Sequence, residues 1–113
     1  MKTLAPLLFL LFFAFTACEK IDDSAPGCIK DLIRHHQKHM FLCEEGASVK
    51  QYLFQEQYVY VFGPGTCGAD MQAPVYSEDC ELLGNLGGFV GNLIINGVRF
   101  DQNATYIKTI WHN

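Results

Sequence analysis

The chain has 113 residues, of which 50% are hydrophobic and 18% are charged, and its formal net charge is −4. These values are ordinary for a globular protein, and the length favours one domain with its own core. The acidic balance argues against a nucleic-acid partner, because phosphate backbones are bound mainly through lysine and arginine. The sequence contains no Gly-x-Ser-x-Gly motif and no phosphate-binding loop, so we expect neither enzyme activity nor a cofactor.

Residues 1–17 have the features of an export signal. Lys2 supplies a positive charge near the start, and residues 4–15 are apolar, interrupted only by Pro6. This run is shorter than the roughly 20 residues that a membrane-spanning helix needs. A short apolar run behind a basic residue at the start of a chain is typical of a cleaved signal peptide.

The segment Phe15-Thr16-Ala17-Cys18 ends the apolar run with two small residues and a cysteine, and it resembles a bacterial lipobox. The resemblance implies that the chain is cut before Cys18 and that this cysteine carries acyl chains, which anchor it to a membrane. We therefore expect a lipoprotein in the outer membrane of a Gram-negative bacterium, on the periplasmic face or at the cell surface. Its membrane contact would be the lipid, and a protein or glycan partner stays open.

The cysteine count supports this interpretation. An exported protein with five cysteines leaves one thiol unpaired, and a lipid on Cys18 accounts for it. The other four can form two disulfides in an oxidising compartment. The disulfide candidates are Cys28, Cys43, Cys67 and Cys80.

A helix is predicted over residues 28–42, after a tether over residues 18–27. The tether is rich in charged, small and turn-forming residues, so we expect it to be flexible. The helix prediction rests on side chains spaced three or four residues apart along one face. They are Ile29, Leu32, Ile33, His36 and Met40.

Strands are predicted in the rest of the chain. Residues 48–55 and 58–62 are rich in Tyr, Phe and Val, and the short link at Glu56-Gln57 favours a hairpin. A short strand is expected over residues 74–77, whereas the glycine-rich residues 85–92 are expected to be irregular.

The C-terminal part also favours β-structure. Asn96-Gly97 between two apolar triplets predicts a type I′ hairpin, and residues 105–111 are β-branched and aromatic enough for a further strand. The order of elements predicts one α+β domain over residues 28–113. In it, a single N-terminal helix packs on a small antiparallel β-sheet.

The predicted helix restricts the disulfide pairing. A continuous helix from Cys28 to Cys43 separates their Cα atoms by about 22 Å, whereas bridged Cα atoms lie roughly 4.4–6.8 Å apart. Cys28 therefore cannot pair with Cys43. Two connectivities remain, and both join the ends of the helix to Cys67 and Cys80.

Two groups of side chains are candidates for a function. His35 and His39 lie one helical turn apart and are weak candidates for a metal site, for which the only histidine outside the helix is His112. Aromatic residues of the first hairpin are candidates for a contact surface, although alternation directs half of them to the core. They are Tyr52, Phe54, Tyr58 and Tyr60.

A local resemblance suggests another function. Cys67-Gly68-Ala69-Asp70, followed by Tyr76 and Cys80, resembles the Cys-Gly-x-Asp…Tyr-x-x-x-Cys stretch of Kazal-type protease inhibitors. The resemblance implies an inhibitor that acts through the loop of residues 63–73. The chain departs from the family in two ways: Cys67 and Tyr76 are two residues too far apart, and the domain has four cysteines where Kazal domains have six.

A set of short segments is spread over most of the chain after the signal. They are Cys28-Ile29, Ala47-Ser48-Val49, Tyr52-Leu53-Phe54-Gln55, Val59-Tyr60-Val61-Phe62, Cys67-Gly68-Ala69-Asp70, Val75-Tyr76, Cys80 and Leu86-Gly87-Gly88-Phe89. Together these segments resemble a family of small Gram-negative lipoproteins for which no activity is established, so the resemblance implies a location and no chemistry. We expect a lipid-anchored cell-envelope protein with a non-catalytic binding or structural role. The alternatives are a secreted protease inhibitor and, third, a metal-binding protein.

Overall fold

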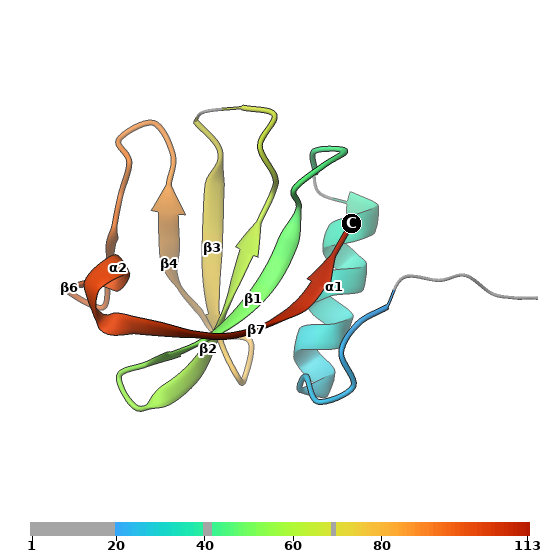
Figure 1. Ribbon diagram of the computed structural model, residues 1–113, viewed down its shortest axis with the longest axis horizontal. Helices are drawn as coiled ribbons and strands as arrows, with labels where there is room; N and C mark the ends of the chain where they lie inside the picture. Colours follow the sequence, from blue (N-terminus) through green and yellow to red (C-terminus); the bar gives the residue numbers. More distant parts are fainter. Residues whose placement is uncertain (1–19, 40–41, 69) are drawn as a thin grey trace, which may run out of the picture.

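The computed structural model describes residues 20–39, 42–68 and 70–113, and its centre is a five-stranded antiparallel sheet (Figure 1). The strand order is β4-β3-β2-β1-β7. With the helix α1 (Gly27–His39) packed on this sheet, the predicted α+β class is confirmed. The strands are β1 (Ser48–Phe54), β2 (Gln57–Gly63), β3 (Gln72–Ser77), β4 (Leu82–Gly87) and β7 (Ala104–His112).

The predicted hairpin of β1 and β2 is present, with its turn one residue earlier than the predicted link at Glu56-Gln57. Ser48 pairs with Gly63 and Phe54 with Gln57, so the two strands are in register along their whole length. The turn consists of Gln55 and Glu56, whose φ angles of 53° and 67° are both positive. Two successive positive φ angles are typical of a type I′ turn, which matches the twist of the strands.

Helix α1 (Gly27–His39) begins where the sequence predicts a helix. The carbonyl oxygen of Pro26 accepts hydrogen bonds from the N–H groups of Ile29 and Lys30 and so starts the helical pattern. Ile29 and Ile33 are buried one turn apart, which confirms the apolar face of the helix. The predicted end at residue 42 is too late, because Leu42 is not helical, and Met40 lies outside the described residues.

The opposite side of the sheet carries a small second layer, seen at the left of Figure 1. β5 (Ile94–Ile95) and β6 (Val98–Arg99) form the predicted hairpin, with φ angles of 52° at Asn96 and 81° at Gly97. A four-residue helix, α2 (Phe100–Asn103), follows and was not predicted.

The prediction of an irregular segment over residues 85–92 is wrong for its first part, because β4 extends to Gly87. The glycines of this region allow close packing as well as turns. A Cβ atom at Gly84 would lie 2.9 Å from Cδ1 of Ile95, so the second layer approaches β4 where β4 has no side chain.

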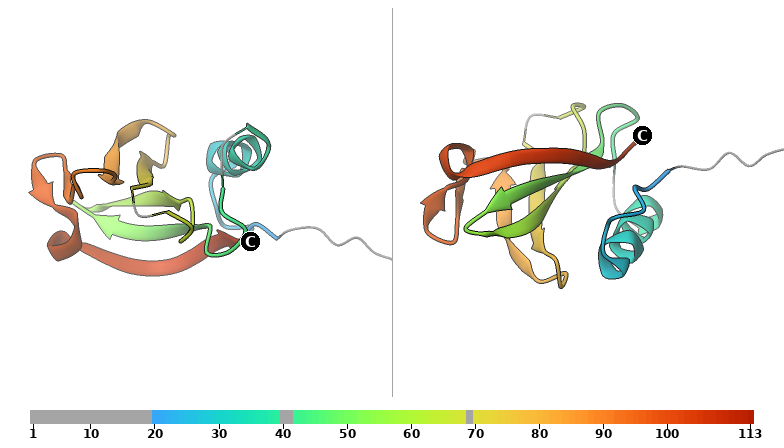
Figure 2. Two further views of the ribbon diagram at one scale, coloured as in Figure 1. Left: turned by 90° about the horizontal axis from the view of Figure 1, so that it is seen from above. Right: turned by 60° about the horizontal axis from the view of Figure 1, so that its bottom comes forward.

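Each face of the sheet has its own core, because side chains alternate along β2. Figure 2 shows α1 well apart from the segment of β5, β6 and α2. Tyr60 and Phe62 point to the side of α1, whereas Val59 and Val61 point to the side of the β5–β6 hairpin. The helix-side core contains Ala25, Ile29, Ile33, Ala47, Val49, Tyr60, Phe62, Ile110 and Trp111. The hairpin-side core contains Phe54, Val59, Val75, Ile95 and Phe100.

Two disulfides join the α1 region to the rest of the domain. Cys28 is bonded to Cys80 and Cys43 to Cys67. This is one of the two connectivities that the helix geometry allows, and the excluded Cys28–Cys43 bond is absent.

The segment before α1 is packed on the domain from Asp22 onward, which corrects the prediction of a flexible tether for residues 22–27. The Asp22 N–H donates to the Ile110 carbonyl at 2.9 Å, and Ala25 is buried. Hydrogen bonds from the Ser24 hydroxyl and N–H, followed by one from Lys108, hold the pKa of the Asp22 carboxyl at about 2. The folded unit therefore begins before the predicted boundary at residue 28.

Candidate functional site

An apolar cavity of about 220 Å³ lies between α1 and the sheet, and it is the candidate site. Its walls come from five separate parts of the chain: α1, the segment around β1, the end of β2, the start of β3 and the end of β7. The lining residues are Ile33, His36, Leu42, Ser48, Val49, Phe62, Gly63, Pro64, Met71, Gln72, Pro74 and Trp111.

Among the described residues that line the cavity, His36 is the only titratable one. The centroid of its ring lies 4.9 Å from that of Phe62 and 6.3 Å from that of Tyr76. Its Nδ1 lies 3.1 Å from the carbonyl oxygen of Leu32, which can only accept, so Nδ1 carries the proton. Desolvation lowers the pKa of His36, more than the Leu32 hydrogen bond raises it, and this favours the neutral ring.

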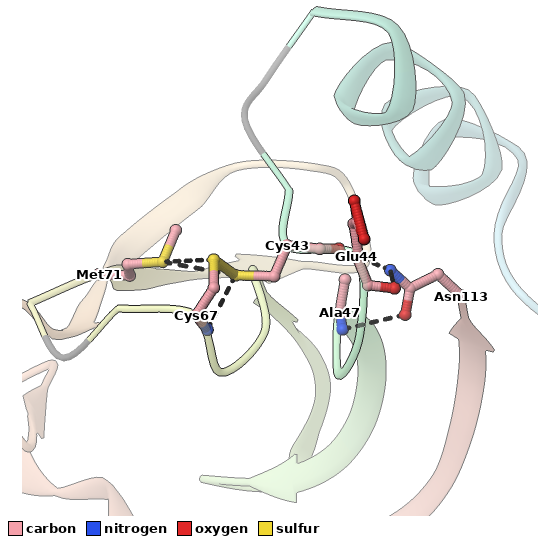
Figure 3. Close-up of a disulfide and its surroundings, with 6 residues drawn as sticks. All are labelled: Cys43, Glu44, Ala47, Cys67, Met71 and Asn113. Atoms are coloured by element: carbon pink, nitrogen blue, oxygen red, sulfur yellow. Dashed lines mark hydrogen bonds between the residues drawn. A yellow bond between two sulfur atoms is a disulfide. The ribbon is translucent and has the colours of Figure 1, made fainter.

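The rim of the cavity is held by the disulfide between Cys43 and Cys67 (Figure 3). The N–H of Cys43 donates to the carbonyl oxygen of Pro64 at 2.8 Å, and the N–H of Cys67 approaches Cys43 Sγ at 3.1 Å. The Sδ atom of Met71 lies 3.7 Å from Cys43 Sγ. The Cys43–Cys67 disulfide and its contacts therefore fix two lining residues, Pro64 and Met71, which lie at opposite ends of the loop between β2 and β3.

The C-terminal residue fixes the neighbouring turn before β1. The Asn113 side chain donates from Nδ2 to the carbonyl oxygens of Cys43 and Glu44, and its Oδ1 accepts from the N–H of Ala47 at 3.1 Å (Figure 3). Its own N–H donates to the Ala47 carbonyl oxygen. This places the end of β7, and with it Trp111, against the start of β1.

Trp111 is a lining residue whose hydrogen-bond donor is unpaired. Its side chain is 5% exposed, and its buried Nε1 has no hydrogen-bond acceptor among the residues that the structure describes. A buried donor without an acceptor costs about 1–3 kcal/mol. Other parts of Trp111 line the cavity, and the same residue also lines a second, more open hollow.

A second hollow of about 950 Å³ lies between the segment before α1, the other side of α1 and the end of β7. It is more open, and charged side chains of both signs line it, among them Lys20, Asp22, Asp23, Lys30 and Arg34. Charges in an open hollow stay solvated, so this surface offers less binding energy to an apolar molecule than the cavity does.

The metal candidates come together only as a pair. The ring centroids of His35 and His39 lie 4.6 Å apart on an exposed part of α1. Within residues 20–39, 42–68 and 70–113 there is no group of three or more His, Cys, Asp or Glu placed to hold a metal ion. His112 lies at the end of β7 and does not complete the pair.

The aromatic candidates of the first hairpin divide between core and surface. Phe54 is 0% and Tyr60 1% exposed, on opposite faces of the sheet, so neither can form a contact surface. Tyr58 is exposed, and Tyr52 is half-buried against Phe100 and Tyr106. A more exposed aromatic residue, which the sequence did not single out, is Phe89 at 86%.

The loop proposed for protease inhibition is shorter than predicted. Gln72 and Ala73 belong to β3, and Pro64 and Met71 face the cavity. Among the described residues of the remaining loop, the exposed ones are Thr66, Cys67, Gly68 and Asp70.

Most of the cavity was not found from the sequence. His36 was placed on the apolar face of the helix, but Trp111 and Met71 carried no motif. The cysteines were the available signal, because Cys43 and Cys67 bring their neighbours Leu42 and Pro64 to the same rim.

The predicted lipid site, Cys18, and the predicted signal peptide lie outside the described residues. Among the described helices, none is long and apolar enough to cross a membrane.

No curated protein and no solved structure matches the chain. The family described as a domain of unknown function (DUF6970) matches residues 37–113, which include the sheet, the Cys43–Cys67 disulfide and all the cavity residues except Ile33 and His36. The chain therefore belongs to the DUF6970 family.

Proposed function

We propose that the protein is a lipid-anchored protein of the Gram-negative cell envelope, attached to the outer membrane through Cys18, whose domain has a non-catalytic binding role. The observation that carries the binding role is the apolar cavity of about 220 Å³ beneath α1. Binding sites for small molecules are typically concave, mostly apolar and equipped with few polar groups. The anchor is supported by the lipobox-like segment and by the pairing of the four other cysteines.

The composition of the cavity favours binding over catalysis. Acid–base or nucleophilic chemistry usually needs at least two polar groups that act on each other, with a perturbed pKa in one of them. In the part of the chain that the structure describes, His36 is the one titratable lining residue, and its Nδ1 is already hydrogen-bonded to the Leu32 carbonyl oxygen. An apolar wall that excludes water instead gains binding energy from the apolar surface that it covers.

The geometry supports the cavity more than the loop as the place of function. An inhibitory loop has to project into the cleft of a protease. Pro64 is held by Cys43, and Met71 packs on the disulfide, so both ends of this loop are bound back to the domain. A panel of serine proteases, assayed before and after reduction of the protein, tests this alternative directly.

The anchor is tested by mass spectrometry of the protein extracted from membranes, with and without reduction. We expect the mass of residues 18–113 plus acyl chains, and a gain of four hydrogens when the two disulfides are reduced. Cys18→Ser should abolish acylation and release the protein from the membrane fraction. An unacylated wild-type protein would contradict the anchor and leave the cavity proposal untouched.

The binding role is tested with benzene as a neutral probe, followed by amide NMR shifts. An apolar cavity of about 150 Å³ is already large enough to bind benzene. We expect saturable shifts that are confined to the residues lining the cavity. Ser48→Leu places a larger side chain in the cavity and should abolish them. Lys50→Leu, on an exposed position two residues along the same strand, is the matched control and should leave them unchanged. Shifts that do not saturate, or that survive Ser48→Leu, would overturn the proposal.

A further inference from the structure

The chain between the proposed anchor and the folded domain is short. Asp22, four residues after Cys18, is already fixed to the domain, because its N–H donates to the Ile110 carbonyl oxygen. Four residues of extended chain reach about 14 Å at most. An acylated Cys18 would therefore hold the domain close to the bilayer, with the surface around Asp22 nearest to the lipid.

That surface is the open hollow of about 950 Å³, which Asp22 itself lines. The hollow lies on the α1 side of the domain, whereas β5, β6 and α2 lie on the opposite side of the sheet (Figure 1). Cationic side chains reach it from two parts of the chain. Lys20 belongs to the segment before α1, and Lys30 and Arg34 lie one helical turn apart on α1.

The acidic side chains of the hollow do not cancel these cations. Asp22 forms an ion pair of 3.3 Å with Lys108, a residue of β7 outside the lining of the hollow. The other lining aspartate is Asp23. Arg34 lies 3.2 Å from Asp31, but both side chains are exposed, and such pairs are weak enough to exchange partners. The hollow therefore keeps a positive balance of charge.

The rest of the domain has the opposite charge. Residues 40–113 contain eight acidic and three basic residues, whereas residues 20–39 contain three acidic and four basic ones. An anionic membrane surface repels the first part and attracts the basic side chains of the second. The short tether and the distribution of charge thus favour the same orientation of the domain.

We infer that this hollow is a docking surface for anionic lipid headgroups, and that Lys20, Lys30 and Arg34 contact the headgroup phosphates. The inference rests on the proposed anchor at Cys18 and adds an orientation to it. In this orientation α1 and the segment before it face the bilayer, and β5, β6 and α2 face away from it.

Trp111 can report on this orientation. It is the single tryptophan of the chain and it lines the hollow, so a nitroxide on a lipid headgroup quenches its fluorescence when the hollow faces the bilayer. The acylated protein is reconstituted in vesicles of phosphatidylcholine, with or without phosphatidylglycerol, and a small fraction of headgroup-labelled lipid. We expect stronger quenching with phosphatidylglycerol. Salt at about 1 M should remove the difference, because it shortens the screening length to roughly 3 Å.

Two matched double variants test the residues. Lys30→Gln/Arg34→Gln removes two cations from the hollow, and Lys50→Gln/Arg99→Gln removes two from β1 and β6. Each arginine forms an ion pair with a nearby aspartate, so both variants lose one such pair. A basic side chain favours approach to an anionic surface about five-fold, so the first variant should lower the ratio of docked to undocked protein about 25-fold. Its quenching should fall to the phosphatidylcholine level, whereas the control variant should keep the wild-type value.

The outcomes separate docking from the anchor, because the mass of the protein is measured before reconstitution. A wild-type protein without acyl chains would overturn the anchor and the docking inference with it. An acylated protein that is quenched equally in both kinds of vesicle would overturn docking alone. Quenching that survives Lys30→Gln/Arg34→Gln, or that falls as far in the control variant, would do the same.

Discussion

The two faces of the sheet are closed in different ways. The hairpin side is covered by β5, β6 and α2, which lie in the chain directly between β4 and β7, the strands at the two edges of the sheet. The helix side is covered by α1, which precedes every strand and is held by disulfides that span 52 and 24 residues. On the hairpin side, β5, β6 and α2 form the local cover, and Phe54 is fully buried there. On the helix side, α1 forms the remote cover, and a cavity remains beside Trp111.

This difference links stability to function. A cover that directly follows a strand in the chain loses little conformational entropy when it packs on the sheet, so packing alone can stabilise it. A cover from the far end of the chain has a larger entropy loss to offset, and covalent bonds reduce that loss in the unfolded state. Because the disulfides carry part of the stability, the helix side can hold an incompletely filled core. That is the side on which a ligand can bind.

The largest effect is expected from a cavity made on the hairpin side. Phe54→Ala removes a fully buried ring from a core that has no covalent support, and we expect a loss of about 3–5 kcal/mol in the free energy of unfolding. Urea denaturation measures it. The loss should be equal in the oxidised protein and in a Cys43→Ala/Cys67→Ala background. A loss that depends strongly on the disulfide would mean that the two faces fold as one inseparable core.

Removal of each disulfide should have an effect within the same range, and its size should follow the length of the closed loop. By loop-closure entropy we expect Cys28→Ala/Cys80→Ala to cost about 4 kcal/mol and Cys43→Ala/Cys67→Ala about 3.5 kcal/mol. Hydrogen exchange should show the loss of protection first in α1 and later in the hairpin-side core. Equal loss of protection on both faces would contradict the separation of the two covers.

A matched pair of added methylene groups sharpens the comparison. Val49 lines the cavity on the helix side, and Val59 is fully buried in the hairpin-side core. Val49→Ile has space to fill and should stabilise the protein by up to about 0.8 kcal/mol, the value of one buried methylene. Val59→Ile has none and should destabilise it by about 1–3 kcal/mol. The midpoints of urea unfolding, at unchanged slope, give both values, and the reverse order would contradict the difference in packing.

The sequence predicts the hairpin side better than the helix side, for physical reasons. The Asn96-Gly97 turn and the alternation of β2 are local patterns, and both are confirmed. The burial of Trp111 follows no such pattern. Ile110 and Trp111 are buried in succession, and β7 pairs with β1 through shifts in register, so strict alternation does not place either residue.

The disulfide pairing and the cavity show the same limit. Helix geometry excluded one connectivity but left two, because the choice between Cys67 and Cys80 depends on how the strands are ordered in the sheet. The cavity depends on the meeting of Ile33, Pro64 and Trp111, which are distant in the chain. A pattern of neighbouring residues cannot predict a space that five separate segments enclose.

The smallest expected effect is the pH dependence that His36 gives to the helix side. Its pKa in the folded protein lies below the ordinary value of 6.5, mainly because burial disfavours the charged ring; His35 adds repulsion, while Phe62 and Tyr76 contribute rings without charge near neutral pH. Between the folded pKa and 6.5 the unfolded chain binds more protons, so stability is greatest above pH 6.5 and falls as the pH drops through this window. His36→Gln should reduce this fall, measured by urea denaturation from pH 7.5 to about pH 5.

An apolar ligand should lower the His36 pKa further, observed by NMR of its ring protons, because it displaces the water that solvates the charged form. A His36 pKa that stays at or above 6.5 in the folded protein would show instead that water enters the helix side freely, and the two faces would then differ in hydration as well as in packing.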